Sequence, residues 1–440
     1  MDLLKGAKVT NEHVYQLDRE YVFHSWSTQG QLNPMVIAGA KGCKLWDYQG
    51  KEYLDFSSQL VNVNIGYQHP KIVEAIREQA LELTTIAPAV ANLKRGEAAK
   101  RIIEHAPAGF KKVFFANAGA DANENAIRMA RIYTGRSKIL SGYRSYHGNT
   151  GSAIVATGDP RRIPNEYAAG HVHFFQPYLY RSEFHSSDEQ QECERALAHL
   201  RRVIELEGPQ AIAGILLETI PGTAGILTPP AGYLQGVRKL CDEFGIVMIL
   251  DEVMAGFGRT GEWFALDGFN VIPDLISFAK GVNSGYIPAG GVIISEKISE
   301  FFNDHYFPGG LTYSGHPMAM AAIVATIDAM VEEKVVENAA MIGQEILAPQ
   351  LQQLQSQHAM IGDVRGKGVF WAIELVSDPQ KRTPLADAQM ALIKADLLAQ
   401  GLLPFVAGNR IHIVPPCVIT SDEVTQGIEM IDKSLKKYSI

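Results

Sequence analysis

Cysteine is scarce in the 440 residues of this chain, and long apolar runs are missing. The four cysteines lie far apart and form no Cys-x-x-Cys pair, which argues against a disulfide framework and against a zinc site. No apolar stretch reaches the roughly 18–20 residues that cross a bilayer, and residues 1–5 lack the apolar stretch of a signal peptide. We therefore expect a cytoplasmic protein that holds no metal and does not enter a membrane.

Positive charge is also in short supply. Lys and Arg number 40 against 48 Asp and Glu, a net charge of −8, and no run of five or more basic residues occurs. This balance argues against nucleic acid as a partner and favours small-molecule ligands. Hydrophobic residues at 46% and charged residues at 20% exclude disorder as the main state, and the length suffices for two domains around a large core.

Strand-like and helix-like segments alternate from about residue 110 to residue 310. Continuous apolar runs, typical of strands buried on both faces of a parallel sheet, occupy residues 113–116, 211–217, 246–250 and 275–278. Apolar residues at helical spacing predict helices over 122–133, over 233–244 and from about 316 onward. The pattern predicts an α/β protein whose mostly parallel central sheet is flanked by helices. Such sheets bind ligands beyond the carboxyl ends of their strands.

The rest of the chain reads as a smaller α+β domain. Residues 1–60 contain a hairpin around Tyr48–Gly50 and are expected to contribute to this small domain. Residues 61–320 form the large domain, and residues 321–440 form the C-terminal part of the small one.

One glycine motif is similar to a dinucleotide-binding fingerprint. Residues 256–261 spell Gly-x-Gly-x-x-Gly. The dinucleotide fingerprint needs a strand directly before the motif and a helix directly after it. Here residues 251–255 intervene, and residues 262–270 have little helical pattern. We therefore interpret the motif as a structural glycine loop.

An acid and an amine follow two of the buried runs. Asp251 follows residues 246–250, and Lys280 follows residues 275–279, so both are expected at the carboxyl edge of one sheet. They could be two unrelated charges at strand ends. They could equally serve pyridoxal phosphate (PLP), because a lysine amine forms a Schiff base with its aldehyde and a carboxylate keeps its pyridine nitrogen protonated.

Two further segments fit the same cofactor. Residues 117–120 are small and open a helix, whose free N–H groups and positive dipole end would suit a phosphate. Asp121 and Glu124 are then expected to point away. Tyr146, before His147, could stack on the pyridine ring. Each segment also has an ordinary interpretation, as a strand-to-helix turn and as a ring packed under a loop.

Together these motifs resemble those of the class III (ω-amino-acid type) aminotransferases, which are PLP enzymes of fold type I. The resemblance runs from about residue 15 to residue 435. Its most specific stretches are residues 250–261 and 273–281, and supporting stretches are residues 146–148, 229–234, 312–317 and 364–368.

The resemblance implies roles for the residues of the ring site. Lys280 matches the Schiff-base lysine, which later moves a proton between substrate and cofactor. Asp251 matches the partner of the pyridine nitrogen. Val253 matches the residue that packs on the ring face opposite Tyr146. Glu218 matches an acidic residue near the cofactor.

It also implies a phosphate cup and a dimer. Gly119 and Ala120 match the cup, although many relatives have a hydroxyl residue beside this glycine where Ala118 and Ala120 stand here. The loss of such a neutral hydrogen bond is worth only about 0.5–1.5 kcal/mol. Thr312 matches a hydroxyl that reaches the phosphate of the neighbouring subunit, so the resemblance implies a homodimer with shared active sites.

The substrate pocket departs from some relatives. Where they have a carboxylate-binding arginine, this chain has Phe405, and Arg410 nearby is either a substitute or a solvated charge. Trp26 and Val61 match positions that line the pocket in relatives, although both could be core residues.

The expected activity is a ping-pong transamination between an ω-amino acid or amine and a 2-oxo acid, pyruvate or 2-oxoglutarate. The sequence of the chain most resembles those of taurine and other ω-amino-acid aminotransferases. A racemase, an aminomutase or a decarboxylating aminotransferase would use the same lysine and acid, and a non-catalytic binding dimer is a remote alternative. The sequence leaves open the donor, the acceptor, and whether two dimers join into a tetramer.

Overall fold

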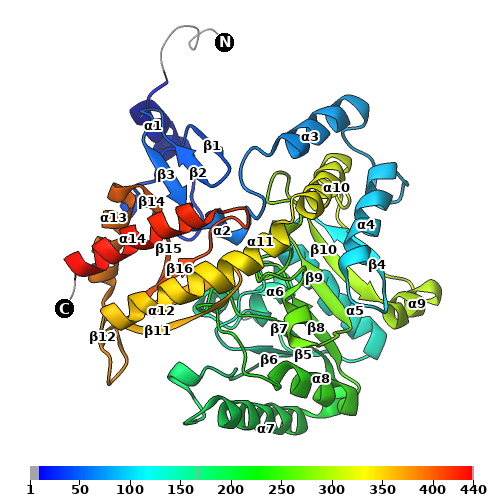
Figure 1. The fold of residues 1–440 in the computed structure, drawn as a ribbon. Coiled ribbons are helices and arrows are strands. Elements are labelled where there is room, and N and C mark those ends of the chain that lie inside the picture. The colour runs from blue at the N-terminus through cyan, green and yellow to red at the C-terminus, as the bar shows by residue number, and fades with distance from the viewer. Residues whose placement is uncertain (1–8, 166–167, 439–440) are drawn as a thin grey trace.

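The computed structural model describes residues 9–165 and 168–438. Residues 1–5, considered above for a signal peptide, lie outside the described part. A seven-stranded sheet forms the centre of the molecule (Figure 1). In spatial order its strands are β4 (Phe110–Ala116), β10 (Gly290–Ser295), β9 (Leu275–Phe278), β8 (Val247–Asp251), β7 (Ile212–Glu218), β5 (Lys138–Gly142) and β6 (His171–Phe174).

The prediction of a mostly parallel sheet is confirmed. Strands β6, β5, β7, β8 and β9 run parallel to one another. Only β10 reverses direction, and it is antiparallel to both β9 and β4. The apolar runs predicted as strands lie in β4, β7, β8 and β9.

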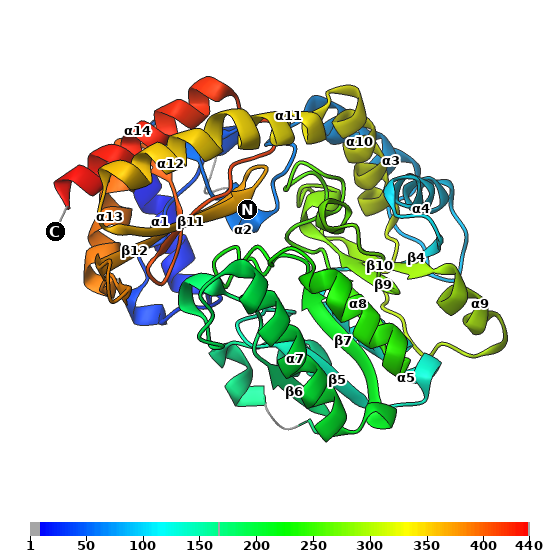
Figure 2. The ribbon, with the colours of Figure 1, turned by 60° about the horizontal axis from the view of Figure 1, so that its bottom comes forward.

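Helices cover both faces of this sheet, which explains why its strands are apolar without alternation. On β8, Val247 and Ile249 pack with the helix α5 (Gly119–Thr134). The intervening Met248 and Leu250 belong to the main core, which includes residues of α7 (Glu189–Glu207) and α8 (Tyr233–Phe244). Figure 2 shows α7 and α8 in front of β5 and β7. Burial on both faces stabilises a strand by about 25 cal/mol per Å² of apolar surface.

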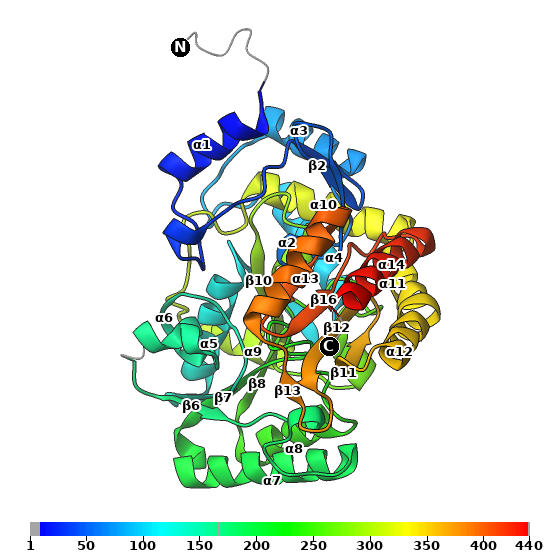
Figure 3. The same cartoon turned by 90° about the vertical axis from the view of Figure 1, so that its left-hand side faces the viewer.

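Two smaller sheets bring the ends of the chain together. The first has the order β1 (Gly39–Lys41), β2 (Lys44–Trp46), β3 (Glu52–Asp55) and β14 (Leu402–Leu403). The second has the order β11 (Ile361–Lys367), β12 (Phe370–Asp378), β16 (Arg410–Ile413) and β15 (Phe405–Ala407), and β13 (Thr383–Pro384) pairs with β12. Because β14 pairs with β3, the C-terminal segment completes a sheet of the N-terminal one. This pairing supports the proposed small domain (Figures 1 and 3).

The remaining helices connect and cover these sheets. α10 begins at Pro317, close to the predicted start near residue 316, and packs against α3 and α4. No helix in the described ranges is long and apolar enough to cross a membrane. The helices not yet given are α1 (Asn11–Tyr21), α2 (Ser58–Val61), α3 (Pro70–Glu82), α4 (Leu93–His105), α6 (Gly151–Ala156), α9 (Glu296–Asp304), α10 (Pro317–Glu332), α11 (Val335–Met341), α12 (Ala348–Gln357), α13 (Asp387–Gln400) and α14 (Ser421–Lys437).

Candidate active site

The carboxyl ends of three neighbouring strands place charged side chains side by side. In the parallel register, Glu218 of β7 lies directly beside Asp251 of β8, and Asp251 lies beside Ser277 of β9. Lys280 follows immediately after β9. A cavity of about 580 Å³ opens at this edge, and all three charged residues line it. The expectation that Asp251 and Lys280 share one sheet edge is confirmed.

Asp251 is a buried carboxylate that accepts several hydrogen bonds. The side-chain amide of Asn123 donates to its Oδ2 over 2.7 Å, and the Nδ1 atom of His147 lies 2.8 Å from the same oxygen. The backbone N–H of Val253 donates to Oδ1 over 3.0 Å. These contacts fix the carboxyl group of Asp251 in one orientation at the cavity wall.

Asn123 and His147 were missed as functional candidates, and both are buried. Asn123 donates to the backbone carbonyl of His147 and accepts a hydrogen bond from Ser277 Oγ, so it is fixed on both sides. The backbone N–H of His147 donates to Thr157. A polar residue one turn into an apolar helix was the only sequence signal for Asn123.

Lys280 is partly buried, and its amine has no hydrogen-bond or ion-pair partner among the described residues. Burial lowers the pKa of Lys280 from 10.5 to about 8. The negative charges of Glu218 and Asp251 oppose this shift, whereas Arg259 and Arg161 reinforce it. A lysine with a lowered pKa has a larger unprotonated fraction, which is the nucleophilic form.

Glu218 is a second buried carboxylate of this edge. Burial raises the pKa of Glu218, and the neighbouring Asp251 adds to this effect. The backbone N–H groups of Tyr146 and Gly222 donate to its two oxygens over 3.0 and 2.9 Å. Glu218 thereby fixes the loop that carries Tyr146 at the cavity.

The start of α5 forms a cradle suited to a phosphate. The first turn of a helix leaves N–H groups without partners inside the helix, and the N-cap residue Ala118 has no side chain to bind them. A Cβ atom at Gly119 would lie 2.8 Å from a methyl carbon of Val253, so only glycine fits there. Glu124 turns away and accepts a hydrogen bond from the backbone N–H of Ala153.

Tyr146 and Val253 both line the cavity, as their predicted places on the two faces of a ring require. The guanidinium of Arg161 lies over the ring of Tyr146, 3.8 Å from its centroid. Such a contact is worth about 0.5–2 kcal/mol and restrains the ring. Arg161 lies on a short 3-10 helix, Pro160–Asn165, and the sequence gave no reason to select it.

These residues fit PLP at its three polar points: an anion-binding helix end, a fixed carboxylate and an amine without a partner. When bound, PLP supplies an aldehyde that an amine can attack and a pyridinium ring that accepts an electron pair. Lys280 would hold the aldehyde carbon, Asp251 would keep the pyridine nitrogen protonated, and the first turn of α5 would bind the phosphate.

Comparison with known proteins agrees with this chemistry. The family model "Aminotransferase class-III" matches residues 26–435. The chain belongs to the class III aminotransferases. It is therefore a PLP-dependent enzyme of fold type I, and the expected fold, enzyme class and cofactor are confirmed. The alternatives with the same cofactor and the non-catalytic dimer are not favoured.

Curated and solved relatives span nearly the whole aminotransferase. The hypotaurine/taurine–pyruvate aminotransferase of Paracoccus denitrificans is 33% identical over 97% of each chain. The putrescine–pyruvate aminotransferase of Pseudomonas aeruginosa is 32% identical over 98% of each. A structure of taurine:2-oxoglutarate aminotransferase from Bifidobacterium kashiwanohense, in complex with PLP and glutamate, is 42% identical over 98% of each chain with a TM-score of 0.94.

Several predicted site residues of the aminotransferase lie outside the cavity wall. Trp26 lines the cavity, but Val61 is buried in an apolar cluster while its neighbours Leu60 and Asn62 line the cavity instead. The structure does not place Val61 in the wall of this cavity, and a role of Val61 in the substrate pocket stays a prediction. Its backbone has a positive φ of 58°.

Three more predicted residues also lie away from this cavity. Thr312 is exposed. Phe405 packs edge-on against the ring of His412, with the ring centroids 4.8 Å apart. Arg410 lines an adjacent cavity.

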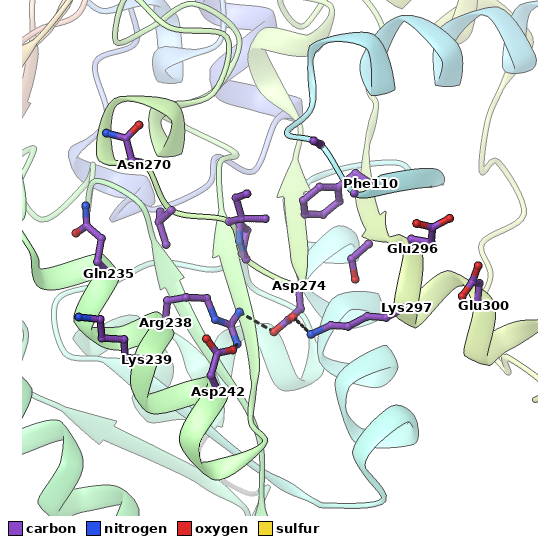
Figure 4. A pocket seen from close by; sticks show the side chains of 16 residues that line it. Phe110, Gln235, Arg238, Lys239, Asp242, Asn270, Asp274, Glu296, Lys297 and Glu300 are labelled. Carbon is purple, nitrogen blue, oxygen red and sulfur yellow. Dashed lines mark hydrogen bonds and ion pairs between the residues drawn. The ribbon is translucent and has the colours of Figure 1, made fainter.

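Another cavity, of about 970 Å³, lies at the opposite, amino end of β9 (Figure 4). At its centre Asp274 forms ion pairs with Arg238, at 2.9 Å, and with Lys297. This cavity lies at the amino ends of the strands, and neither Asp251 nor Lys280 lines it, so it does not belong to the cofactor site. Within residues 9–165 and 168–438, no group of three or more His, Cys, Asp or Glu side chains is arranged to hold a metal ion.

Replacement of Lys280 tests its role directly. We expect Lys280→Ala to abolish turnover and the visible absorbance of the lysine-linked cofactor, because among the described residues no other side-chain amine lines the cavity. Exposed Lys239, at the amino end of the sheet, gives a matched control, and Lys239→Ala should retain both signals. Turnover by Lys280→Ala at the wild-type rate would show that the assigned role is wrong.

The lowered pKa of Lys280 predicts how cofactor uptake depends on pH. Because only the unprotonated amine attacks an aldehyde, the rate at which cofactor-free enzyme takes up PLP should rise with pH through about 8 and then level off. An ordinary lysine would instead give a rate that still climbs at pH 10. Stopped-flow absorbance at several pH values distinguishes the two outcomes.

Proposed function

We propose that this aminotransferase moves the amino group of an acidic ω-amino acid, such as taurine or β-alanine, to a 2-oxo acid in two half-reactions with ping-pong kinetics. With PLP bound, the amine of Lys280 would be the group that accepts and returns the proton of the substrate carbon that carries nitrogen. Asp251 would bind the pyridine nitrogen. The choice of an acidic substrate rests on one observation, an arginine-lined cavity next to the cofactor cavity.

This second cavity has a volume of about 440 Å³. Arg144, Arg161 and Arg410 line it, together with a single acidic residue, Asp159. The two cavities are adjacent, because Thr223 lines both of them. In addition, Arg161 of the second cavity contacts the ring of Tyr146, which lines the cofactor cavity. A molecule that reaches Lys280 could therefore extend toward these three arginines.

Of the three arginines, only Arg410 has no acidic partner among the described residues. Arg144 forms an ion pair with Glu183 at 3.3 Å, and Arg161 contacts Asp159 at 3.0 Å. Arg410 has no hydrogen-bond or ion-pair partner in the described part of the chain, and its Nε atom is buried. Burial lowers its pKa. Arg410 is only partly buried, but its buried Nε has no acceptor, and a carboxylate or sulfonate would supply paired hydrogen bonds to the guanidinium.

The relatives act on substrates of both kinds, since their names include taurine, which is acidic, and putrescine, which is a diamine. Three arginines support the acidic donor here. They also support 2-oxoglutarate over pyruvate as the acceptor, because only the former carries a second carboxylate for Arg410. Both 2-oxo acids are named among the relatives.

Substitution of Arg410 should separate the two acceptors. We expect Arg410→Met to raise the KM for 2-oxoglutarate by about 10- to 100-fold, the loss of one charge-assisted hydrogen-bonded pair, and to change the KM for pyruvate much less. The measurement is a set of steady-state rates with taurine, β-alanine, 4-aminobutyrate and putrescine against each acceptor.

Arg136, which binds backbone carbonyls far from the site, supplies the matched control as Arg136→Met. An equal loss with both acceptors, or a wild-type preference for putrescine, would contradict the assignment of Arg410 to an acidic group.

We also propose a homodimer. Trp26 is 63% exposed and Leu60 is 49% exposed although both line the cofactor cavity, so the described chain leaves this wall open. Thr312 is exposed and is not part of its own cavity wall. A second copy that covers this face would close the wall and could bring its own Thr312 to the phosphate end. Other exposed apolar side chains available to such an interface are Tyr21, Phe23, Leu93 and Tyr313.

The dimer predicts a mass in solution of twice 48.2 kDa. Analytical ultracentrifugation measures it, and a tetramer would show as a further doubling. Phe23→Asp should shift the mass toward the monomer and weaken cofactor retention together, because it places a charge in the proposed apolar interface. A wild-type monomer that retains PLP fully would contradict shared active sites.

The cysteines bear on the compartment that we propose. All four are buried free thiols. Burial raises the pKa of each, to about 12 for Cys241, which makes the thiolate rare. Unreactive free thiols support a reducing compartment, the cytoplasm.

A further inference from the structure

The glycine loop Gly256–Gly261 surrounds a side chain that the chemistry described so far does not use. Arg259 is among the largest side chains of the described chain that are fully buried, with 0% exposure. No strand–loop–helix unit frames the motif, because turns precede it and bends follow it. A buried guanidinium is costly, and its contacts therefore need an explanation.

Arg259 binds three segments that are far apart in the chain. Its Nη1 atom donates to the backbone carbonyls of Val369 and Pro415, both from the C-terminal part of the chain. Its Nη2 atom donates to Ser58 Oγ over 3.2 Å and to Asn64 Oδ1 over 2.8 Å. No carboxylate of the described residues lies within ion-pair distance, so Arg259 stays cationic on neutral oxygens alone. Its contacts join the N-terminal and C-terminal segments to the loop after β8.

Asn64 extends these contacts to Lys280. The side-chain amide of Asn64 donates to the backbone carbonyl of Phe257 over 2.7 Å. A Cβ atom at Gly281 would lie only 2.3 Å from Asn64 Nδ2, so this amide lies directly on the backbone that follows Lys280. Lys280 itself has a positive φ of 46°, a strained conformation that its surroundings must hold in place.

Ser58 extends the contacts to the cavity wall. Ser58 and Gln59 have positive φ values of 45° and 60°, so the segment that begins here is also strained. The same segment supplies Leu60 and Asn62 to the cofactor cavity. Arg259 thus lies between two strained segments, one that carries the amine and one that forms the wall opposite it.

We propose that Arg259 is a positioning residue of the cofactor site, which fixes the backbone at Lys280 through Asn64, fixes the cavity wall through Ser58, and places a permanent positive charge behind the amine. The proposal rests on the role proposed for Lys280. It assigns a function in this fold to the arginine of the glycine loop.

Four charged groups act on the amine of Lys280: Glu218 and Asp251 favour its protonated form, and Arg259 and Arg161 disfavour it. Loss of the charge at Arg259 should therefore favour the protonated amine. The pH at which cofactor uptake reaches half its maximum should rise, whereas a purely structural arginine would leave this midpoint unchanged.

The experiment compares Arg259→Gln and Arg259→Lys with the wild-type full chain, freed of cofactor and mixed with PLP. We expect Arg259→Gln to raise the midpoint of the uptake rate by at least about 0.5 pH units. Arg259→Lys should keep the midpoint, because it keeps the charge, but should slow uptake by about 3- to 10-fold because it cannot bridge the same carbonyls. Arg136→Gln is the control, since Arg136 also binds several backbone carbonyls but at the amino end of the sheet.

Thermal unfolding of all variants separates folding from positioning. An Arg259→Gln variant that folds like Arg136→Gln and keeps both the midpoint and the rate of wild type would overturn the proposal. Should Arg259→Gln fail to fold, Asn64→Ser tests the contact with Gly281 alone, and wild-type uptake kinetics in that variant would overturn it equally. Borohydride reduction and peptide mass analysis of wild type locate the bound PLP, so that attachment away from Lys280 marks failure of the proposed function instead.

Discussion

The parallel register of β7, β8 and β9 is the constraint on which the site depends. Hydrogen bonding sets Glu218 beside Asp251 and Asp251 beside Ser277, so the residues that follow these strands must meet at one edge. Each strand is apolar on both faces because α5 covers one face and the main core the other. A slip of one residue would turn Asp251 into the packed interior, where an unpaired carboxylate is costly. The strand register that packs the core therefore also fixes the position of Asp251.

Burial and hydrogen bonding act differently on the two charged residues of this edge. Asp251 is buried and is contacted by Asn123, His147 and the backbone N–H of Val253, so its carboxyl group is fixed in one orientation. Lys280 is partly buried without a hydrogen-bond partner among the described residues, and burial lowers its pKa to about 8. A fixed acid and an amine with a lowered pKa are what an enzyme needs to bind a pyridine nitrogen at one end and to attack an aldehyde at the other.

The sequence was sufficient to find Asp251, Lys280 and the start of α5, because each lies at or just after the end of a strand with a continuous apolar run. Tyr146 lies four residues after β5 and was found as an aromatic residue in the loop that follows a short strand. It could not find Asn123 or the importance of His147, because their role is to bind Asp251 across distances of more than a hundred residues along the chain. The sequence could not show that Leu60 and Asn62, and not Val61 between them, line the cavity, because the backbone there has positive φ values that its residue types do not favour. Arg144, Arg161 and Arg410 come from three separate segments of the chain, so no single stretch of sequence predicts the cavity that they line together.

The glycine loop shows why a motif must be interpreted through its contacts. Glycines in the dinucleotide fingerprint let a phosphate approach the backbone. Here a glycine lets two segments of the chain pack closely, because a Cβ atom at Gly261 would lie 2.8 Å from the backbone of Ala340. This close packing encloses Arg259, which can reach Pro415 and Ser58 only because the loop brings its backbone so near to both. The same small residues therefore serve the junction of three segments, and the cationic side chain at its centre connects that junction to the amine of the active site.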